Sequence, residues 1–341
     1  MRVLITGGAG FIGTNCALRF AEEGHEVCVF DNLSRRGSAA NIEYLKQHGL
    51  KQFVYGDVRS YDDVLHTLRP GFDVVIHLAA QVAVTTSVER PRHDFEVNAL
   101  GTFNVLEGLR TACPDAFLIY ASTNKVYGEL SNIAVEERNG RYQFVDTAGV
   151  SEAHPIDFHS PYGCSKGAAD QYVRDYARIY GLRAVVFRQS CIYGPWQFGI
   201  EDQGWVAWFT IAAALGLPIT IYGDGKQVRD VLYVDDLADV FRAAIANPEA
   251  AQGKIYNIGG GPENQISLLE LLEKLRAMLG KDIEYSFGPW RPGDQKVFVC
   301  DISRVKAELR WEPQTTIDEG LEKLVKWVAD NQEIIRSNLF T

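Results

Sequence analysis

A short apolar strand that runs straight into a glycine-rich turn is the feature that most constrains this chain. Residues 1–6 precede glycines at positions 7, 8, 10 and 13. Glycines let backbone N–H groups approach a pyrophosphate without a Cβ in the way, and the helix N-terminus beyond them offers unpaired donors and a favourable dipole. The pattern therefore predicts a dinucleotide-binding strand, turn and helix centred on Gly7, Gly10 and Gly13.

A carboxylate at the end of the second predicted strand supports this interpretation. The apolar run 27–30 is followed by Asp31, roughly 20 residues after the glycine turn, where a carboxylate can bind ribose hydroxyls. The same carboxylate would repel a 2′-phosphate, so NAD is favoured over NADP. Arg35 and Arg36 follow soon after and keep NADP open as the second choice.

Composition and charge narrow the class of protein. The 341 residues are 46% hydrophobic, enough for a large core and one or two domains, and the net charge is −10. Such an acidic, mixed surface argues against nucleic acid or an anionic membrane as the main partner. The six cysteines form no C-x-x-C pair, no metal site is indicated, and no signal peptide precedes the first strand. We therefore expect reduced cysteines and a cytoplasmic location.

Strand and helix alternate through the first half of the chain. This alternation predicts an α/β fold, a doubly wound parallel sheet with helices on both faces. We expect strands at 3–6, 26–30, 52–55, 74–78, 117–122, 184–188 and 254–258, and helices at 13–23 and 91–111.

The remaining segments are irregular and rich in Trp, Pro and Gly. We predict that they form a second, smaller substrate-binding domain of residues 189–231 and 261–341, beside an NAD-binding Rossmann domain of residues 1–188 and 232–260. The apolar stretch 205–222 is interrupted by Gly216 and Pro218. Each piece is shorter than the ~20 residues of a membrane span, so a buried helix and a strand are expected there.

Tyr162 and Lys166 lie four residues apart at the start of a predicted helix. Ser160 can cap this helix and Pro161 suits its first turn, so the two side chains share one face. A phenol has a pKa of about 10, and a nearby ammonium lowers it by stabilising the phenolate. The pair can therefore remove a hydroxyl proton while hydride leaves the same carbon for NAD.

Hydroxyl side chains end the fifth predicted strand. The carboxyl ends of parallel strands present ligands, so Thr123 can hydrogen-bond the reacting oxygen beside Tyr162. Each motif alone has an ordinary alternative, a Ser/Thr-rich loop or a solvated helix pair. Both motifs occur in one chain together with the glycine turn, and this combination favours a catalytic set of Thr123, Tyr162 and Lys166.

Together these motifs resemble the extended short-chain dehydrogenase/reductase family along the whole chain. Members act on nucleotide sugars as NAD-dependent epimerases, 4,6-dehydratases and decarboxylases. The resemblance implies a homodimer or homotetramer formed through helices 91–111 and 161–180. It also implies cofactor contacts, besides the glycines, Tyr162 and Lys166, at Phe11, Ile12, Asp31, Asn32, Asp57, Val58, Leu78, Ala79, Ala80, Gln81 and Asn98.

Longer strings are similar to one subgroup, the C2-epimerases of CDP-sugars. The strings are residues 122–128, 157–172, 202–205 and 225–232. The resemblance implies a CDP-sugar substrate and transient oxidation at C2 with a bound, recycled NAD. A UDP-hexose 4-epimerase is the alternative, because the same three residues serve C4 if the sugar is rotated. A non-catalytic NAD-binding protein is the competing class.

The residues after Thr123 help to choose the reaction. A 4,6-dehydratase needs an acid and a base beyond the tyrosine, usually a carboxylate pair directly after the threonine. Asn124 and Lys125 occupy those positions, so dehydration and decarboxylation are less favoured.

Arginines are the expected ligands of the substrate diphosphate, because a guanidinium pairs with phosphate oxygens in a fork. A structural hydrogen-bonding role is favoured for His159, and core positions for Trp205 and Trp208. The candidate substrate contacts are Thr123, Asn124, Gln189, Gln227, Arg229 and Arg291.

Overall fold

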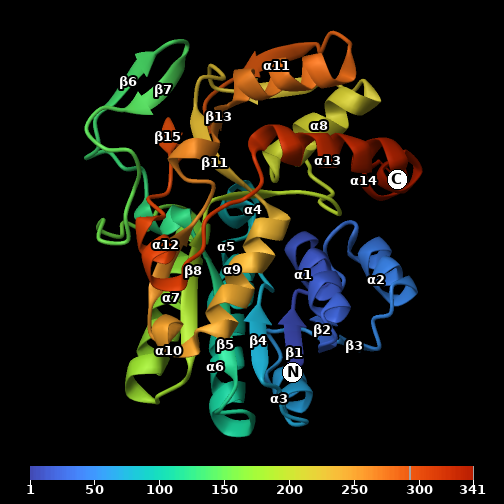
Figure 1. Ribbon diagram of the computed structural model, residues 1–341, viewed down its shortest axis with the longest axis vertical. Coiled ribbons are helices and arrows are strands. Elements are labelled where there is room, and N and C mark those ends of the chain that lie inside the picture. Colours follow the sequence, from blue (N-terminus) through green and yellow to red (C-terminus); the bar gives the residue numbers. More distant parts are fainter. Residues whose placement is uncertain (292, 341) are drawn as a thin grey trace.

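One parallel sheet of seven strands organises the structure (Figure 1). The computed structural model describes residues 1–291 and 293–340. The spatial order of the strands is β12–β8–β5–β4–β1–β2–β3, and each neighbouring pair is parallel. This confirms the predicted fold class. The strands are β1 (Arg2–Thr6), β2 (Glu26–Asp31), β3 (Gln52–Tyr55), β4 (Val74–His77), β5 (Phe117–Thr123), β8 (Ala184–Gln189) and β12 (Ile255–Ile258).

Helices cover both faces of the sheet, because successive strand residues point to opposite faces. In β1, Val3 and Ile5 pack into one core cluster and Leu4 into another. The first cluster lies under α1 (Phe11–Glu22), α2 (Ser38–Gln47), α9 (Val234–Ala246), α10 (Pro248–Ala251) and α12 (Ser303–Leu309). The second lies under α3 (Tyr61–Leu68), α6 (Gly101–Ala112) and α7 (Ser160–Ile179).

The order of the strands reverses between β1 and β4. From β1 the chain adds β2 and β3 on one side, and β4 then pairs with the other side of β1. Open α/β sheets bind ligands at such a switch point, beyond the carboxyl ends of the strands. The glycine turn, the segment 78–81 and Thr123 all lie at this edge.

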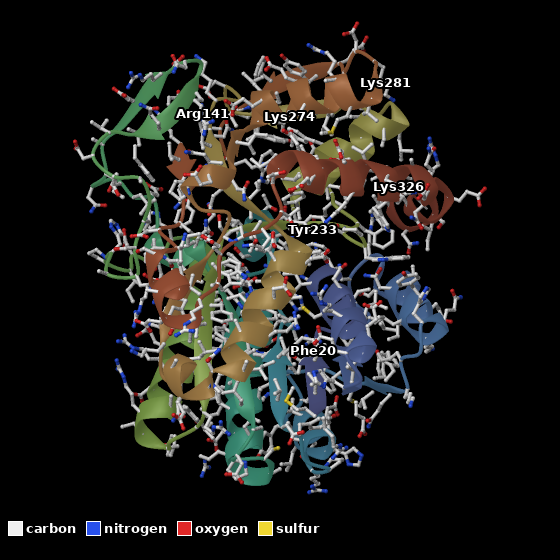
Figure 2. All side chains as sticks on the ribbon, in the orientation of Figure 1. Phe20, Arg141, Tyr233, Lys274, Lys281 and Lys326 are labelled. Atoms are coloured by element: carbon white, nitrogen blue, oxygen red, sulfur yellow. The ribbon has the colours of Figure 1, made fainter. Side chains whose placement is uncertain are left out.

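A second group of elements lies above the carboxyl ends of the sheet (Figure 1). Its central strand is β11 (Val228–Tyr233), and Tyr233, labelled in Figure 2, lies where the chain passes from this strand into α9. The strands that pair with β11 are β9 (Cys191–Tyr193), β13 (Gln265–Ser267) and β15 (Val297–Phe298). The helices of this group, which share a separate core cluster, are α8 (Trp205–Leu215), α11 (Leu268–Leu279), α13 (Ile317–Asp330) and α14 (Gln332–Leu339).

The predicted domain boundaries remain predictions. In two places, elements assigned by sequence to one domain pack against residues assigned to the other. The hairpin of β6 (Val135–Arg138) and β7 (Arg141–Phe144) belongs to the first segment in sequence, yet the Tyr142 hydroxyl donates to Asp224 at 2.6 Å, just before β11. Conversely, Val305 and Leu309 of α12 pack into the core cluster that contains Val3 and Ile5 of β1.

The apolar stretch 205–222 folds as predicted into a helix and a strand. Helix α8 is followed by Gly216 with a φ of 69°, and β10 (Ile219–Tyr222) pairs with β14 (Tyr285–Gly288). Within the described part of the chain, no helix combines the length and apolar character that crossing a membrane requires.

The region predicted as one helix over 91–111 is instead divided. It consists of α5 (Pro91–Phe95), a π-helical segment (Glu96–Leu100) and α6, and is preceded by α4 (Val84–Glu89). Short π segments inside helices are frequent at functional sites. Here the segment carries Asn98, one of the residues expected near the cofactor.

His77 ends β4 and is buried between two hydroxyl groups. Its Nδ1 lies 2.6 Å from Oγ1 of Thr6, and its Nε2 lies 3.0 Å from Oγ1 of Thr102. The Thr102 hydroxyl donates to the carbonyl of Asn98, so it accepts from Nε2 and the ring carries its proton there. Burial lowers the pKa of His77 to about 3, which keeps the ring neutral at physiological pH.

We predict that His77 lowers the stability of the fold as the pH decreases below 6.5, its ordinary pKa. The unfolded chain then binds a proton that the folded ring does not take up, so the free energy of unfolding falls, by at most about 1.4 kcal/mol per pH unit. Urea denaturation of the wild type and of His77→Asn between about pH 7 and pH 5 measures this effect. The variant should show the smaller pH dependence, and equal slopes would contradict the prediction.

Candidate active site

The glycine turn packs so closely against the backbone after β4 that two positions exclude a side chain. A Cβ at Gly7 would lie 2.6 Å from the backbone N of Ala79, and a Cβ at Gly13 would lie 2.5 Å from the carbonyl O of Gly7. At Gly10 a Cβ would meet only that same carbonyl oxygen, at 3.1 Å. The space beside Gly10, at the start of α1, is therefore open and fits a pyrophosphate.

Asp31 lies beside this turn at the end of β2. Its Oδ2 accepts the N–H of Ala9 at 3.1 Å and its Oδ1 accepts the N–H of Leu33 at 2.8 Å. Burial raises the pKa of the carboxyl above its ordinary value, against these hydrogen bonds. The side chain is thus held in one orientation at the position expected for the ribose.

The two arginines that kept NADP open are engaged elsewhere. Arg35 donates to the side chain of Gln203, and Arg36 donates to the carbonyl of Leu339 at 3.1 Å. Because both arginines already bind residues of the C-terminal half of the chain, neither is left free for a 2′-phosphate, and the geometry favours NAD.

The remaining predicted cofactor contacts lie along the same edge of the sheet. Asn32 donates to Asp57 at 2.9 Å, and the guanidinium of Arg59 holds the pKa of Asp57 at about 2. Val58 is buried against Gly101 of α6. The half-buried members are Phe11 and Ile12 at the start of α1 and Leu78, Ala79, Ala80 and Gln81 after β4.

The side chain of Asn98 is bonded to protein groups. Its Oδ1 accepts the N–H of Gln81 at 2.9 Å and its Nδ2 donates to the carbonyl of Gln81 at 3.0 Å. Nδ2 also lies 3.1 Å from both Asp94 and Ser165, and the Ser165 hydroxyl donates to Asp94 at 2.5 Å. Asn98 therefore positions the segment after β4 and ties it to α7. The sequence reasoning missed Asp94 and Ser165, although Ser165 lies inside the Tyr162–Lys166 motif.

Tyr162 and Lys166 lie in the first turns of α7, and Thr123 ends the neighbouring β5. All three residues are buried. Ser160 has a φ of 64° and accepts the N–H of Gly163 at 3.2 Å, so it makes the predicted capping bond within the helix bounds Ser160–Ile179. The structure thus brings the three candidate catalytic residues together.

The Lys166 ammonium contacts residues of β5 instead of Tyr162. Its Nζ donates to the carbonyl of Ala121 at 2.5 Å and lies 4.5 Å from the centre of the Tyr120 ring. Burial lowers the pKa of Lys166 to about 7 and raises the pKa of Tyr162 to about 12, although the Thr123 hydroxyl lowers the latter. From the sequence we expect Lys166 to lower the pKa of Tyr162. With the protein groups alone this is wrong, because burial of the phenol raises its pKa more than its neighbours lower it.

Two of the predicted substrate contacts carry buried, unsatisfied amide atoms. Thr123 pairs in register with Gln189 of β8, whose Nε2 has no hydrogen-bond partner among the described residues. The Oε1 of Gln227 is also unpaired there, whereas its Nε2 donates to the carbonyl of Tyr222 at 2.6 Å. A buried polar atom without a partner is costly, so both amides fit polar groups of a ligand. Asn124 accepts from the Thr123 hydroxyl at 3.3 Å.

Both predicted phosphate-binding arginines have carboxylate partners in the chain. Arg229 is buried and its Nη2 lies 2.6 Å from Asp294. Arg291 pairs with Asp202 at 3.0 Å and stacks on the ring of Tyr222 at 4.1 Å. The sequence did not indicate either carboxylate, because both lie far from their arginines along the chain.

His159 lies at the surface beside a carboxylate, and the two tryptophans expected in the core lie at its edge. His159 lies 3.1 Å from Glu129, and both side chains are largely exposed. Trp205 and Trp208 of α8 are half-buried against the second core cluster. In the residues that the structure describes, no group of three or more His, Cys, Asp and Glu side chains is arranged to bind a metal ion.

Comparison with known proteins identifies the family. Residues 3–259 match the NAD dependent epimerase/dehydratase family. The chain belongs to this family. It is 45% identical over 336 residues to the CDP-paratose 2-epimerase of Salmonella typhi, a match that covers 96% of this chain and 99% of that protein.

Solved structures of epimerases share the fold of this epimerase/dehydratase family member. UDP-glucose 4-epimerase from Thermotoga maritima with UDP-glucose has a TM-score of 0.85 at 31% identity, covering 98% of this chain and 100% of that one. The UDP-glucose 4-epimerase of Thermus thermophilus in complex with NAD has a TM-score of 0.81 at 34% identity, covering 96% and 99%. The protein is therefore an NAD-dependent enzyme, and the open space beside Gly10 fits that cofactor.

We predict that alanine lowers stability at one glycine of the turn and weakens NAD binding at another. Gly13→Ala places a methyl group 2.5 Å from the Gly7 carbonyl, which should cost about 1–3 kcal/mol of stability. Gly10→Ala meets that atom at 3.1 Å from an ordinary φ of −74°, so stability should change little. Its methyl group would instead fill the space for the pyrophosphate and weaken NAD binding. Urea denaturation and NAD titration separate the two effects. Gly10→Ala with unchanged NAD affinity would show that the cofactor does not approach there.

Proposed function

We propose that the protein is a nucleotide-sugar C2-epimerase that interconverts CDP-paratose and CDP-tyvelose. The 45% identity to a CDP-paratose 2-epimerase over nearly the whole of both chains is the observation that carries this proposal. The UDP-glucose 4-epimerases of known structure are more distant, at 31% and 34%. CDP-glucose is a further candidate substrate, because its C2 presents the same hydroxyl.

The candidate residues suit oxidation and re-reduction at one carbon. Bound NAD supplies a hydride acceptor and donor at C2. Tyr162 takes the proton of the C2 hydroxyl and later returns it, while Thr123 hydrogen-bonds the same oxygen. Lys166 turns away from the Ala121 carbonyl, and its ammonium then stabilises the tyrosinate and binds the nicotinamide ribose. The 2-ketose presents its other face before reduction, so no net redox change occurs.

The residues beside Thr123 support epimerisation over dehydration. Neither Asn124 nor Lys125 is a carboxylic acid, and the Asn124 side chain already accepts from the Thr123 hydroxyl. A second acid–base pair for expelling water is therefore lacking at these two positions. A UDP-hexose 4-epimerase is the second candidate, supported by the structures that share this fold.

The stereochemistry of the products shows whether C2 or C4 is the reacting carbon. We predict that CDP-paratose incubated with the purified enzyme is inverted at C2, as read by NMR, with no added NAD and no accumulation of NADH. CDP-glucose and UDP-glucose serve as parallel substrates. Inversion at C4 with C2 untouched would overturn the C2 assignment.

The matched variant is Tyr162→Phe, which removes one hydroxyl and keeps the ring. It should abolish turnover and retain bound NAD, because the glycine turn and Asp31 are unchanged. Turnover equal to that of the wild type would reject Tyr162 as the base.

We infer that the protein forms a homodimer or homotetramer through the outer faces of α6 and α7. Phe103 and Tyr172 lie exposed and edge to face, with their ring centres 5.8 Å apart. Further apolar side chains are exposed on α4, on the helical segments from α5 to α6 and at the end of α7. They are Val88, Phe95, Leu100, Ile179 and Tyr180. Clustered apolar exposure of this kind is typical of protein interfaces. We also place the protein in the cytoplasm, a location that its six free cysteines support.

We predict that Tyr172→Glu yields a monomer, because it places a charge in the centre of the proposed interface. Light scattering at micromolar concentration measures the oligomeric state. Phe287→Glu, on the exposed ring of β14, is the control and should leave the state unchanged. A wild-type protein that is already monomeric would refute the interface.

A further inference from the structure

Lys125 is a partly buried cation in the candidate site to which the proposed mechanism gives no role. It lies two residues after Thr123, in a short 3₁₀-helix (Asn124–Tyr127) that follows β5. Its backbone N–H donates to the Thr123 hydroxyl at 3.2 Å, which fixes the backbone of Lys125 to the candidate catalytic threonine. Its side chain extends to the second group of elements, where Nζ lies 3.5 Å from Oε1 of Gln295.

The charges around Lys125 do not balance. Two nearby carboxylates act on the Lys125 ammonium, Asp294 and Glu129. Asp294 pairs with Arg229 at 2.6 Å, and Glu129 lies 3.1 Å from His159. Arg229 is further bound by the carbonyls of Val228 at 2.7 Å and Gln295 at 2.5 Å. In the part of the chain that the structure covers, no carboxylate forms an ion pair with the Lys125 ammonium. Burial and the positive charge of Arg229 lower the pKa of Lys125 by more than Asp294 and Glu129 raise it.

An uncompensated cation in a partly buried position is costly unless a ligand supplies the missing anion. The amide Nε2 of Gln189, on the strand residue paired with Thr123, is a second donor without a partner among the described residues. Two residues next to Thr123 in the fold therefore have N–H groups left for a ligand. The Lys125 ammonium makes one long hydrogen bond, to Gln295, and the Gln189 amide nitrogen makes none among the described residues. Their chemistry fits oxygen atoms of an anionic ligand better than neutral hydroxyl groups alone.

The position of the reacting carbon indicates which anion this is. In a nucleotide sugar, C1 carries the β-phosphate, C2 is bonded directly to C1, and C4 lies on the far side of the ring. A reaction at C2 therefore brings the β-phosphate close to Thr123 and Tyr162, whereas a reaction at C4 keeps the phosphate a ring's width away. A phosphate-binding cation on a residue close in sequence to the catalytic threonine therefore suits a reaction at C2 better than a reaction at C4.

We propose that the Lys125 ammonium binds the β-phosphate of the nucleotide sugar and thereby selects C2 as the reacting carbon. This inference rests on the proposed C2-epimerase function and assigns its specificity to one residue. Lys125 anchors the phosphate while the ketose turns its other face, so the intermediate stays attached at the end nearest the reacting carbon.

The test compares the binding of CDP and CMP to the purified holoenzyme by calorimetry. The two ligands differ by the β-phosphate, so the ratio of their dissociation constants isolates the contact. Lys125→Met keeps the length of the side chain and removes its charge, and should weaken CDP binding about tenfold to about a hundredfold, with little effect on CMP. Lys125→Arg should retain the preference for CDP. Lys296→Met, at an exposed lysine next to Gln295, is the matched control and should behave as the wild type.

Catalysis supplies a second measurement that separates this inference from the proposed function. Lys125→Met should lower kcat/KM for CDP-paratose by a similar factor, while bound NAD stays at the wild-type value and the thermal midpoint is equal to that of the wild type or higher. C2 inversion by the wild type together with an unchanged CDP-to-CMP ratio in Lys125→Met would overturn the role of Lys125 and leave the C2-epimerase function standing. C4 inversion by the wild type would overturn the proposed function, and with it the selection of C2 by Lys125.

Discussion

The rest of the structure depends on the contact between two backbones at the switch point of the sheet. Because Gly7 carries no side chain, the turn after β1 packs directly on the backbone of Ala79, just beyond β4, and Gly13 lets α1 pack against the carbonyl of Gly7. This contact sets the spacing at the carboxyl ends of the two central strands. The adjoining strands then present Asp31 on one side and Thr123 on the other. The cofactor edge and the catalytic edge are therefore one continuous surface.

Features encoded by neighbouring residues could be predicted from the sequence, and features that join distant segments could not. The strand pattern, the glycine turn and the shared face of Tyr162 and Lys166 follow from local periodicity and spacing, and the structure contains them. The bond from Lys166 to Ala121 spans 45 residues of sequence, and the bond from Ser165 to Asp94 spans 71. No local pattern specifies such pairs, and they decide the direction of the ammonium and the anchoring of α7.

Desolvation, more than charge, sets protonation at the centre of the site. With a pKa of about 12 for Tyr162 and about 7 for Lys166, the folded chain keeps Tyr162, the proposed base, as a neutral phenol. In the proposed mechanism, the charge that activates the phenol comes from Lys166, once it turns toward Tyr162, and from the cofactor that joins the site on binding. Proton removal is thereby tied to the presence of both ligands, which protects an oxidation that has to be reversed on the same molecule.

Helix α7 serves two surfaces at once. Its inner face carries Tyr162 and Lys166, its outer face exposes Tyr172, and Ser165 ties it to Asp94 just before the π-helical segment. Substitutions on the outer face therefore act on a helix whose position also determines the aim of the phenol. The proposed subunit interface and the proposed catalytic pair thus share one helix, so related enzymes that assemble differently should also differ in the packing beneath this helix.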